Sequence, residues 1–318
     1  MRLYALTALA FSLSSLCAAP VRAEGDGRFV QPASVQESEA AQHLVQARAL
    51  IASGHHLEGI AEQTRAIEIN PLDAIAHRER AKAWHMKQRF ELAIADYNRA
   101  LQLAPRDPDS FFGRAISLHA SGNPAAAIED YSRAAMLRPD WSDPYRMRGH
   151  ALIAQGQYVR AIAEFKRGLD QDPKDIANLI GLGYARLYMG ELPVAADNFI
   201  RALRLSDDVR AMLFLYIVRA RQGVDGKVEL TRYADRVRRK TWPYPVLSLY
   251  LGTAEPDAVL AQARTEVEQC EAHYYMGQWL AAKGQRAEAL ASMTQALKRC
   301  PKTNIEYEAA AAAARGGI

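Results

Sequence analysis

Small and apolar positions recur along this chain with a period of 34 residues. Five nine-residue blocks read GIAEQTRAI, AIADYNRAL, AIEDYSRAA, AIAEFKRGL and AADNFIRAL, and a sixth, ALASMTQAL, follows after a gap. The blocks begin at Gly59, Ala93, Ala127, Ala161, Ala195 and Ala289. A fixed period of this length predicts a stacked array of helical hairpins. Such an array presents an extended concave surface rather than a catalytic cleft.

Each block has the spacing of one apolar helix face. In the second repeat the apolar positions recur at i, i+3, i+4 and i+7. They are Phe90, Ala93, Ile94, Tyr97, Ala100 and Leu101. Glycines stand where the first helix of a hairpin should end, which suits a left-handed cap. They are Gly54, Gly122, Gly156, Gly190 and Gly284. Prolines after the blocks should stop the second helix. They are Pro71, Pro105, Pro139, Pro173 and Pro301.

The period divides the chain into segments. We expect a flexible leader over 24–38, five repeats over 39–207, a degenerate helical segment over 208–269, a further repeat over 270–303 and a capping helix over 304–318. In the degenerate segment the pattern predicts helices over 212–220 and 232–240, a break at 242–245, a short helical turn over 247–251 and a helix start at Pro256.

The N-terminal residues 1–23 read as a secretory signal peptide. Arg2 supplies a positive charge, an apolar stretch follows, and small residues precede a cleavage site after Ala23. We therefore expect a periplasmic or secreted protein, with an uncleaved anchor as the alternative. Lipid anchoring at Cys17 is not expected, because Leu16 stands where Gly or Ala normally precedes a lipidated cysteine.

Composition excludes some partners and suggests one covalent link. The formal net charge is +4, and two of these charges lie in the signal segment, so nucleic-acid binding is not expected. Membrane contact should be peripheral at most. Cys270 and Cys300 remain after signal cleavage, at neighbouring ends of one predicted hairpin. We favour a disulfide between them over two independent buried thiols.

The repeats resemble the tetratricopeptide repeat (TPR), which has small residues at three positions, one buried aromatic residue and a late proline. The third repeat matches with Phe111, Ala115, Ala127, Tyr131, Ala134 and Pro139. The first is weaker, with His43, Gly59 and Gln63. The resemblance covers about two-thirds of the chain. It implies an all-α solenoid of helical hairpins with a right-handed superhelix.

The last hundred residues resemble the NlpI-like periplasmic TPR lipoproteins. The similarity rests on the stretch from Trp242 to Gly252 and on the cysteine, paired tyrosines and glycine between Cys270 and Gly277. The resemblance implies an adaptor for cell-envelope proteases and peptidoglycan hydrolases. The chain departs from that family in lacking a good lipobox at Cys17.

Charged residues also follow the period. Block arginines recur at Arg65, Arg99, Arg133, Arg167 and Arg201. Acidic residues precede the first four by three positions, at Glu62, Asp96, Asp130 and Glu164. Residues three apart share a helix face, so we expect a ladder of solvated ion pairs. The basic run over 232–240 is interpreted as a solvated helix face.

The first helix of each repeat should line the groove. TPR positions then give a groove that is basic at one end and apolar at the other, which suits an extended peptide with a carboxylate and hydrophobic side chains. The candidate contacts are Arg78, Lys82, His85, Phe112, His119, Arg146, His150 and Tyr184. Ordinary solvated surface is the alternative.

No motif indicates catalysis, a cofactor or a metal. The eight histidines show no ligand spacing, although His85 and His119 share one repeat position. We therefore predict a non-enzymatic, exported scaffold or adaptor with protein or peptide partners, among them envelope proteases and peptidoglycan hydrolases. A cell-envelope hydrolase or its regulatory subunit is one alternative, and a homodimeric or larger structural scaffold is another.

Overall fold

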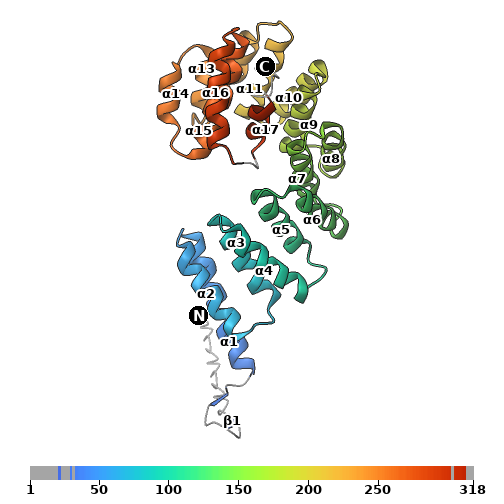
Figure 1. Ribbon diagram of the computed structural model, residues 1–318, viewed down its shortest axis with the longest axis vertical. Helices are drawn as coiled ribbons and strands as arrows, with labels where there is room; N and C mark the ends of the chain where they lie inside the picture. The colour runs from blue at the N-terminus through green and yellow to red at the C-terminus, as the bar shows by residue number, and fades with distance from the viewer. Residues whose placement is uncertain (1–20, 23–28, 31–32, 302–303, 313–318) are drawn as a thin grey trace, which may run out of the picture. The chain divides into compact units, whose positions relative to one another are not determined.

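The computed structural model describes residues 21–22, 29–30, 33–301 and 304–312. Within them the chain is all-α apart from one pair of two-residue strands (Figure 1). The elements are β1 (Val21–Arg22), β2 (Phe29–Val30), α1 (Ala33–Ala52), α2 (His56–Ile69), α3 (Ala74–Met86), α4 (Phe90–Leu103), α5 (Pro108–Ala120), α6 (Pro124–Leu137), α7 (Ser142–Ala154), α8 (Tyr158–Gln171), α9 (Ile176–Tyr188), α10 (Leu192–Leu205), α11 (Val209–Arg221), α12 (Lys227–Ala234), α13 (Tyr244–Leu251), α14 (Pro256–Gln262), α15 (Glu266–Ala282), α16 (Arg286–Arg299) and α17 (Ile305–Ala312). They form two compact units, Met1–Ala76 and His77–Ile318.

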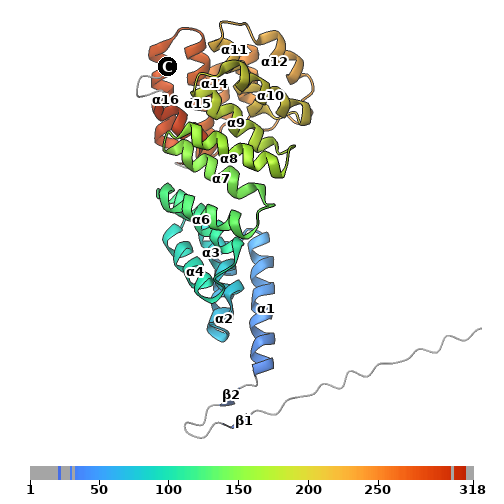
Figure 2. The same ribbon diagram turned by 90° about the vertical axis from the view of Figure 1, so that its right-hand side faces the viewer.

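The first unit is a single hairpin. Its helices α1 and α2 lie side by side (Figure 2) and bury a small core around Leu44, Ala66 and Ile67. The expectation of a flexible leader over 24–38 is wrong in part, because β2 pairs with β1 and α1 begins at Ala33. No Gly or Pro stands between 33 and 38, so nothing in that stretch prevents the helix from extending. The predicted signal peptide and Cys17 lie outside the described residues, apart from the two residues of β1.

The second unit is a run of packed hairpins. Each of α5, α7 and α9 packs against the helix that follows it, and each hairpin packs against the next. Small residues allow the helices to approach closely. At Gly149, an added Cβ would lie 2.8 Å from the ring of the buried Phe165, which is closer than real Cβ atoms come. The period therefore places small residues and aromatic rings opposite each other.

The turn inside each hairpin uses the left-handed conformation. Gly54, Gly122, Gly156, Gly190 and Gly284 have φ between +71° and +90°, as the helix-end pattern predicts. In the second repeat the equivalent residue is Gln88, with φ of 56°. A side chain in this conformation is disfavoured, so the second repeat carries backbone strain that the other repeats avoid.

We expected the periodic acidic residues to form solvated ion pairs, but the structure shows that their side chains are buried. Glu62, Asp96, Asp130 and Glu164 are each at most 8% exposed. Two of them do contact the expected arginine, at 2.6 Å for Arg65–Glu62 and 3.1 Å for Arg167–Glu164. The main partners in the second unit are other arginines, also 34 residues apart, on the preceding helix. These are Arg80, Arg114 and Arg148.

Arg114 shows how this contact works. Its guanidinium donates to both carboxylate oxygens of Asp130, at 2.6 and 2.7 Å, and to Asn98 Oδ1 at 2.7 Å. The side chain therefore joins α5 to α6 within its own repeat and to α4 of the preceding one. This bidentate pairing compensates the free-energy cost of burying the charged carboxylate.

The degenerate segment differs from the expected helices. The basic helix is shorter and shifted: α12 ends at Ala234, and residues 236–240 are not helical. That stretch is mostly exposed and supplies no apolar stripe for packing. The helix after the Trp242–Pro243 break is longer than predicted, because α13 already begins at Tyr244 with Pro245 in its first turn. The start of α14 at Pro256 is as predicted.

The last hairpin is formed by α15 and α16. It begins at Glu266, four residues before the repeat pattern resumes at Cys270, because Thr265 and Glu268 form a capping box there. Cys270 in α15 and Cys300 after α16 are joined in a disulfide, with their Cα atoms 4.8 Å apart. The helix α17 follows and contacts α7, α15 and α16.

Candidate protein-binding groove

A cleft of about 470 Å³ opens between α3 and α5, and we call it the α3/α5 groove. It brings together four of the predicted groove residues, Arg78, Lys82, His85 and Phe112. The remaining lining residues are Glu79, Met86, Tyr97, Asp109, Gly113, Ile116 and Trp141. The groove therefore combines charged groups from α3 with an apolar wall from α5 and from the start of α7.

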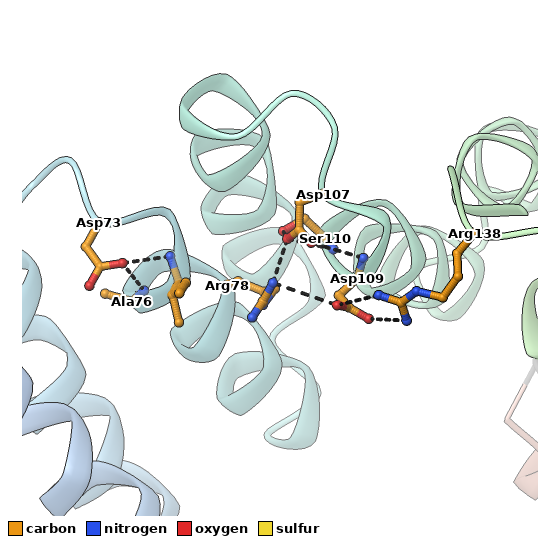
Figure 3. A network of polar contacts seen from close by, with 8 residues as sticks. Asp73, Ala76, Arg78, Asp107, Asp109, Ser110 and Arg138 are labelled. Carbon is orange, nitrogen blue, oxygen red and sulfur yellow. Dashed lines mark hydrogen bonds and ion pairs between the residues drawn. The ribbon is translucent and has the colours of Figure 1, made fainter. Parts of the chain in front are cut away.

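Arg78 is held in an ion-pair network (Figure 3). Its Nη1 lies 2.8 Å from Asp107 Oδ2 and 3.9 Å from Asp109 Oδ2. Asp109 in turn binds the guanidinium of Arg138 at 3.0 and 3.1 Å. The basic end predicted for the groove is thus largely neutralised by carboxylates of the next repeat.

Asp107 has a second task, because it caps α5. It accepts hydrogen bonds from the backbone N–H groups of Asp109 and Ser110 and from the Ser110 hydroxyl. Burial would raise the pKa of Asp107, but the hydrogen bonds from Ser110 and Arg78 outweigh it and hold that pKa below its usual value. Arg78 is therefore a structural link between α3 and the start of α5.

Lys82 differs from Arg78. Its side chain is exposed, and it makes no ion pair within the part of the chain that the structure describes. His85, one turn further along α3, lies with Nδ1 3.0 Å from Ser117 Oγ. Burial lowers the pKa of His85, so its imidazole is neutral near pH 7. Lys82 is the cation that a ligand's carboxylate can reach without displacing a partner described here.

The apolar wall is aromatic. The Phe112 and Trp141 rings are tilted with centroids 4.4 Å apart, and Phe112 also contacts Tyr131 at 5.7 Å. Arg138 stacks over Trp141 at 4.6 Å, which fixes the outer side of the indole. Together with Ile116 these rings form a surface that can take a large apolar side chain.

Two other predicted groove residues line a second cleft. Arg146 and His150 of α7 border a space of about 910 Å³, together with the N-terminal parts of α9, α11, α15 and α17. Arg146 pairs with Asp143 on its own helix. Burial first, and then the charges of Arg146 and His119, lower the pKa of His150 to about 3. The two residues are therefore separated from the α3/α5 groove.

The last two predicted groove residues lie inside the protein. His119 is 3% exposed, and Tyr184 is 1% exposed within an aromatic cluster that includes Tyr188 and Phe214. The apolar end of the expected groove is thus packed core and not an open surface. The reason is that C-terminal helices cover it, as the 3.2 Å contact between the Tyr188 and Tyr274 hydroxyls shows.

Sequence reasoning missed Trp141 and Asp107, the carboxylate that lies nearer to Arg78. Trp141 and Asp107 occupy the same position of successive repeats, in the connection between hairpins, whereas only helix positions were considered. Their 34-residue separation was the available signal. Within the described residues there is no group of three or more potential metal-ligating side chains, and no described helix is long and apolar enough to cross a membrane.

Comparisons with known proteins agree with this architecture. Tetratricopeptide repeat models match residues 44–108, 89–144, 118–187 and 270–303, which together span more than half of the chain. The chain belongs to the tetratricopeptide repeat family. Proteins of this family are generally non-catalytic, and their repeats form protein-binding scaffolds. The comparison with curated proteins gave no match.

Several solved structures share the fold. A tetratricopeptide repeat protein from Parabacteroides merdae is 13% identical, with 87% of this chain and 98% of that one covered at a TM-score of 0.61. The C-terminal part of a repeat protein from Cytophaga hutchinsonii is 19% identical, with 84% and 98% covered at 0.53. MamA from Desulfovibrio magneticus is 16% identical, with 52% and 94% covered at 0.50. At these identities the likeness concerns the fold alone.

Proposed function

We propose that this protein is an exported, non-catalytic adaptor that binds an extended segment of a protein partner in the α3/α5 groove. One observation carries the proposal: Lys82 is exposed beside an aromatic wall that includes Phe112 and Trp141. A groove of this size and lining suits one large side chain and a few residues around it.

The chemistry of the groove defines the segment. A carboxylate, from Asp, Glu or a chain end, would pair with Lys82, while a large apolar side chain would pack on Trp141 and Ile116. The ion pairs of Arg78 keep the charge around the groove balanced. We therefore expect segments with one or two acidic residues beside an aromatic or aliphatic anchor rather than highly acidic tails.

Export and envelope partners are the second part of the proposal. The signal-like residues 1–23 and the Cys270–Cys300 disulfide support an oxidising compartment such as the periplasm. The resemblance of the C-terminal region to envelope adaptors supports proteases and peptidoglycan hydrolases as partners. A fusion of residues 1–38 to alkaline phosphatase tests export, because that enzyme is active only where its own disulfides form.

Peptide selection tests the groove. A library of displayed extended peptides is selected on the wild-type protein, and the affinities of the recovered peptides are measured by fluorescence polarisation. We expect acidic–apolar sequences, about tenfold weaker binding to Lys82→Glu and a larger loss with Trp141→Ala. Lys87→Glu is the matched control, because Lys87 is exposed on the same segment and does not line the groove. Peptides that bind all four proteins equally would refute the proposed site.

A further inference from the structure

The C-terminal helix α17 is short and depends on its packing. It has eight residues and contacts α7, α15 and α16, so that in Figure 1 it lies (dark red) between the last hairpin and the green helices. Isolated helices of this length are not stable in water. The position and the helicity of α17 therefore depend on the few side chains that hold it against its neighbours, among them Glu306, Tyr307 and Ala310.

Glu306 is the unusual member of this contact. It is 3% exposed, and its Oε1 accepts a hydrogen bond from the Tyr275 hydroxyl at 3.2 Å. Within the described residues no Lys or Arg side chain forms an ion pair with it. A buried carboxylate without a cation beside it is costly, so the group favours its protonated form.

The cation that interacts electrostatically with Glu306 is already engaged. Arg210 donates to Glu271 Oε1 at 2.6 Å, and Trp242 Nε1 donates to Glu271 Oε2 at 2.5 Å. Glu271 is itself 3% exposed and lies beside Glu306 in the wall of the 910 Å³ cleft. If Glu306 ionised, its negative charge would lie buried beside that of Glu271, which already pairs with the guanidinium of Arg210.

Other titratable groups face this region from every neighbouring element. Tyr274 and Tyr275 of α15 and Tyr184 of α9 interact electrostatically with Glu306. Arg146 and His150 of α7 line the same cleft. On α16, Arg299 bonds to Gln269 and Gln295, and the remaining charged side chains, Arg286, Glu288 and Lys298, are exposed. None of these groups supplies Glu306 with an ion-pair partner.

The direction of the proton linkage follows. Burial first, and then the charge of Glu271, raise the pKa of Glu306 to about 7 from its usual 4.5. In a released helix the carboxyl would be solvated and would titrate near its usual value. The docked state therefore binds the proton more tightly, and docking weakens as the pH rises from 4.5 to 7.

We propose that α17 is a proton-controlled latch: it docks against α7 and α15 while Glu306 is protonated, and it is released when Glu306 ionises. Release would remove Asn304 and Glu306 from the wall of the 910 Å³ cleft and expose the surface of α7 that α17 covers. This inference goes beyond the proposed function, since it needs neither a partner nor the α3/α5 groove. It assigns the C-terminal end of the chain a regulatory role.

The expected effect is large. The ratio of released to docked helix should rise about tenfold per pH unit between 4.5 and 7, or about 300-fold in all. Hydrogen–deuterium exchange of the full chain, corrected for the pH dependence of intrinsic exchange, measures this ratio in a peptide covering 305–312. A peptide from α2, which belongs to the first unit, serves as the internal reference. We expect the protection of α17 to fall with rising pH while that of α2 shows no such fall.

Two variants distinguish the effect of Glu306 protonation from a change in the general stability of the protein. Glu306→Gln mimics the protonated group and should keep α17 protected at every pH. Glu288→Gln makes the same charge change at an exposed position of α16, which also packs against α17, and should retain the wild-type dependence. Protection of wild-type α17 that does not change between pH 5 and 8 overturns the proposal, and this holds even if a variant fails to fold. An equal pH dependence in Glu306→Gln and wild type overturns it as well.

Discussion

His119 should make the folded state sensitive to mild acid. The side chain is 3% exposed on α5, and neither ring nitrogen has a hydrogen-bond partner among the described residues. Burial lowers its pKa to about 4 from the usual 6.5. The unfolded chain therefore binds a proton between pH 6.5 and 4 that the folded chain does not, and the free energy of unfolding falls as the pH falls through this window.

The magnitude follows from the displacement of the pKa. One pKa unit corresponds to about 1.4 kcal/mol, so His119 alone should remove about 3 kcal/mol of stability between pH 6.5 and 4. His150, whose pKa is lowered to about 3, acts in the same direction. Since whole domains are stable by about 5–15 kcal/mol, this loss would be readily visible.

The matched substitution is suggested by the repeat itself. Ile153 and Leu187 occupy the position of His119 in the next two repeats, and both are buried. In His119→Leu the titrating group is gone while an apolar side chain fills the site. Urea unfolding followed by circular dichroism at pH 7.5, 6.5, 5.5 and 4.5 should show an advantage of the variant over wild type that grows by about 3 kcal/mol toward the acid end.

A second variant distinguishes the effect of His119 protonation from the effect of side-chain packing at the same site. His119→Gln removes the titration but keeps polar atoms in the site, so its stability should be lower at pH 7.5 yet change with pH as that of His119→Leu does. Groups that do not interact with His119 titrate equally in all three proteins and cancel in the differences. His150, whose pKa the charge of His119 lowers, titrates alike in the two variants. If the difference between wild type and His119→Leu is constant from pH 7.5 to 4.5, the argument from burial is wrong.

Three further changes test the packing of the array by urea midpoints. Gln88→Gly should stabilise the protein by about 0.5–1 kcal/mol, because glycine adopts the left-handed turn without strain; a lower midpoint would contradict this. Arg114→Leu should cost about 3 kcal/mol, because it leaves Asp130 buried without its main cation, whereas the double variant with Asp130→Leu should recover part of the loss. Replacing Cys270 and Cys300 by Ser should cost about 3–4 kcal/mol for a closed loop of this length, and a midpoint equal to that of the wild type under oxidising conditions would refute it.

The hairpins could be predicted because their information is local. In the second repeat, the spacing of Ala93, Tyr97 and Ala100 predicts helix α4. The residues near Ala104 predict where this helix ends. Whether Tyr184 faces a groove or a core could not be predicted, because the answer depends on Tyr274 and other residues about ninety positions later. The period describes contacts between adjacent repeats and carries no information on a helix that returns to cover them.

The candidate groove could also be predicted only in part from the sequence. Lys82 and Phe112 could be placed on its surface from their repeat positions. The neutralisation of Arg78 could not, because it requires Asp107, which lies in a connection between hairpins. Side chains in connections are positioned by caps and turns, and the helical period does not specify them.

The arginine contacts stop where the large apolar core begins. Arg80, Arg114 and Arg148 join successive helices, but the next equivalent residue is Leu182, which belongs to a continuous core reaching the last helices. The array therefore has two parts that differ in cooperativity. In one part, small separate cores are joined by the arginine contacts, and in the other a single core unites the helices. Under load or in denaturant, the α3–α6 region should open hairpin by hairpin while α7–α17 melts as a unit. A partner held in the α3/α5 groove would stiffen the more compliant part of the array.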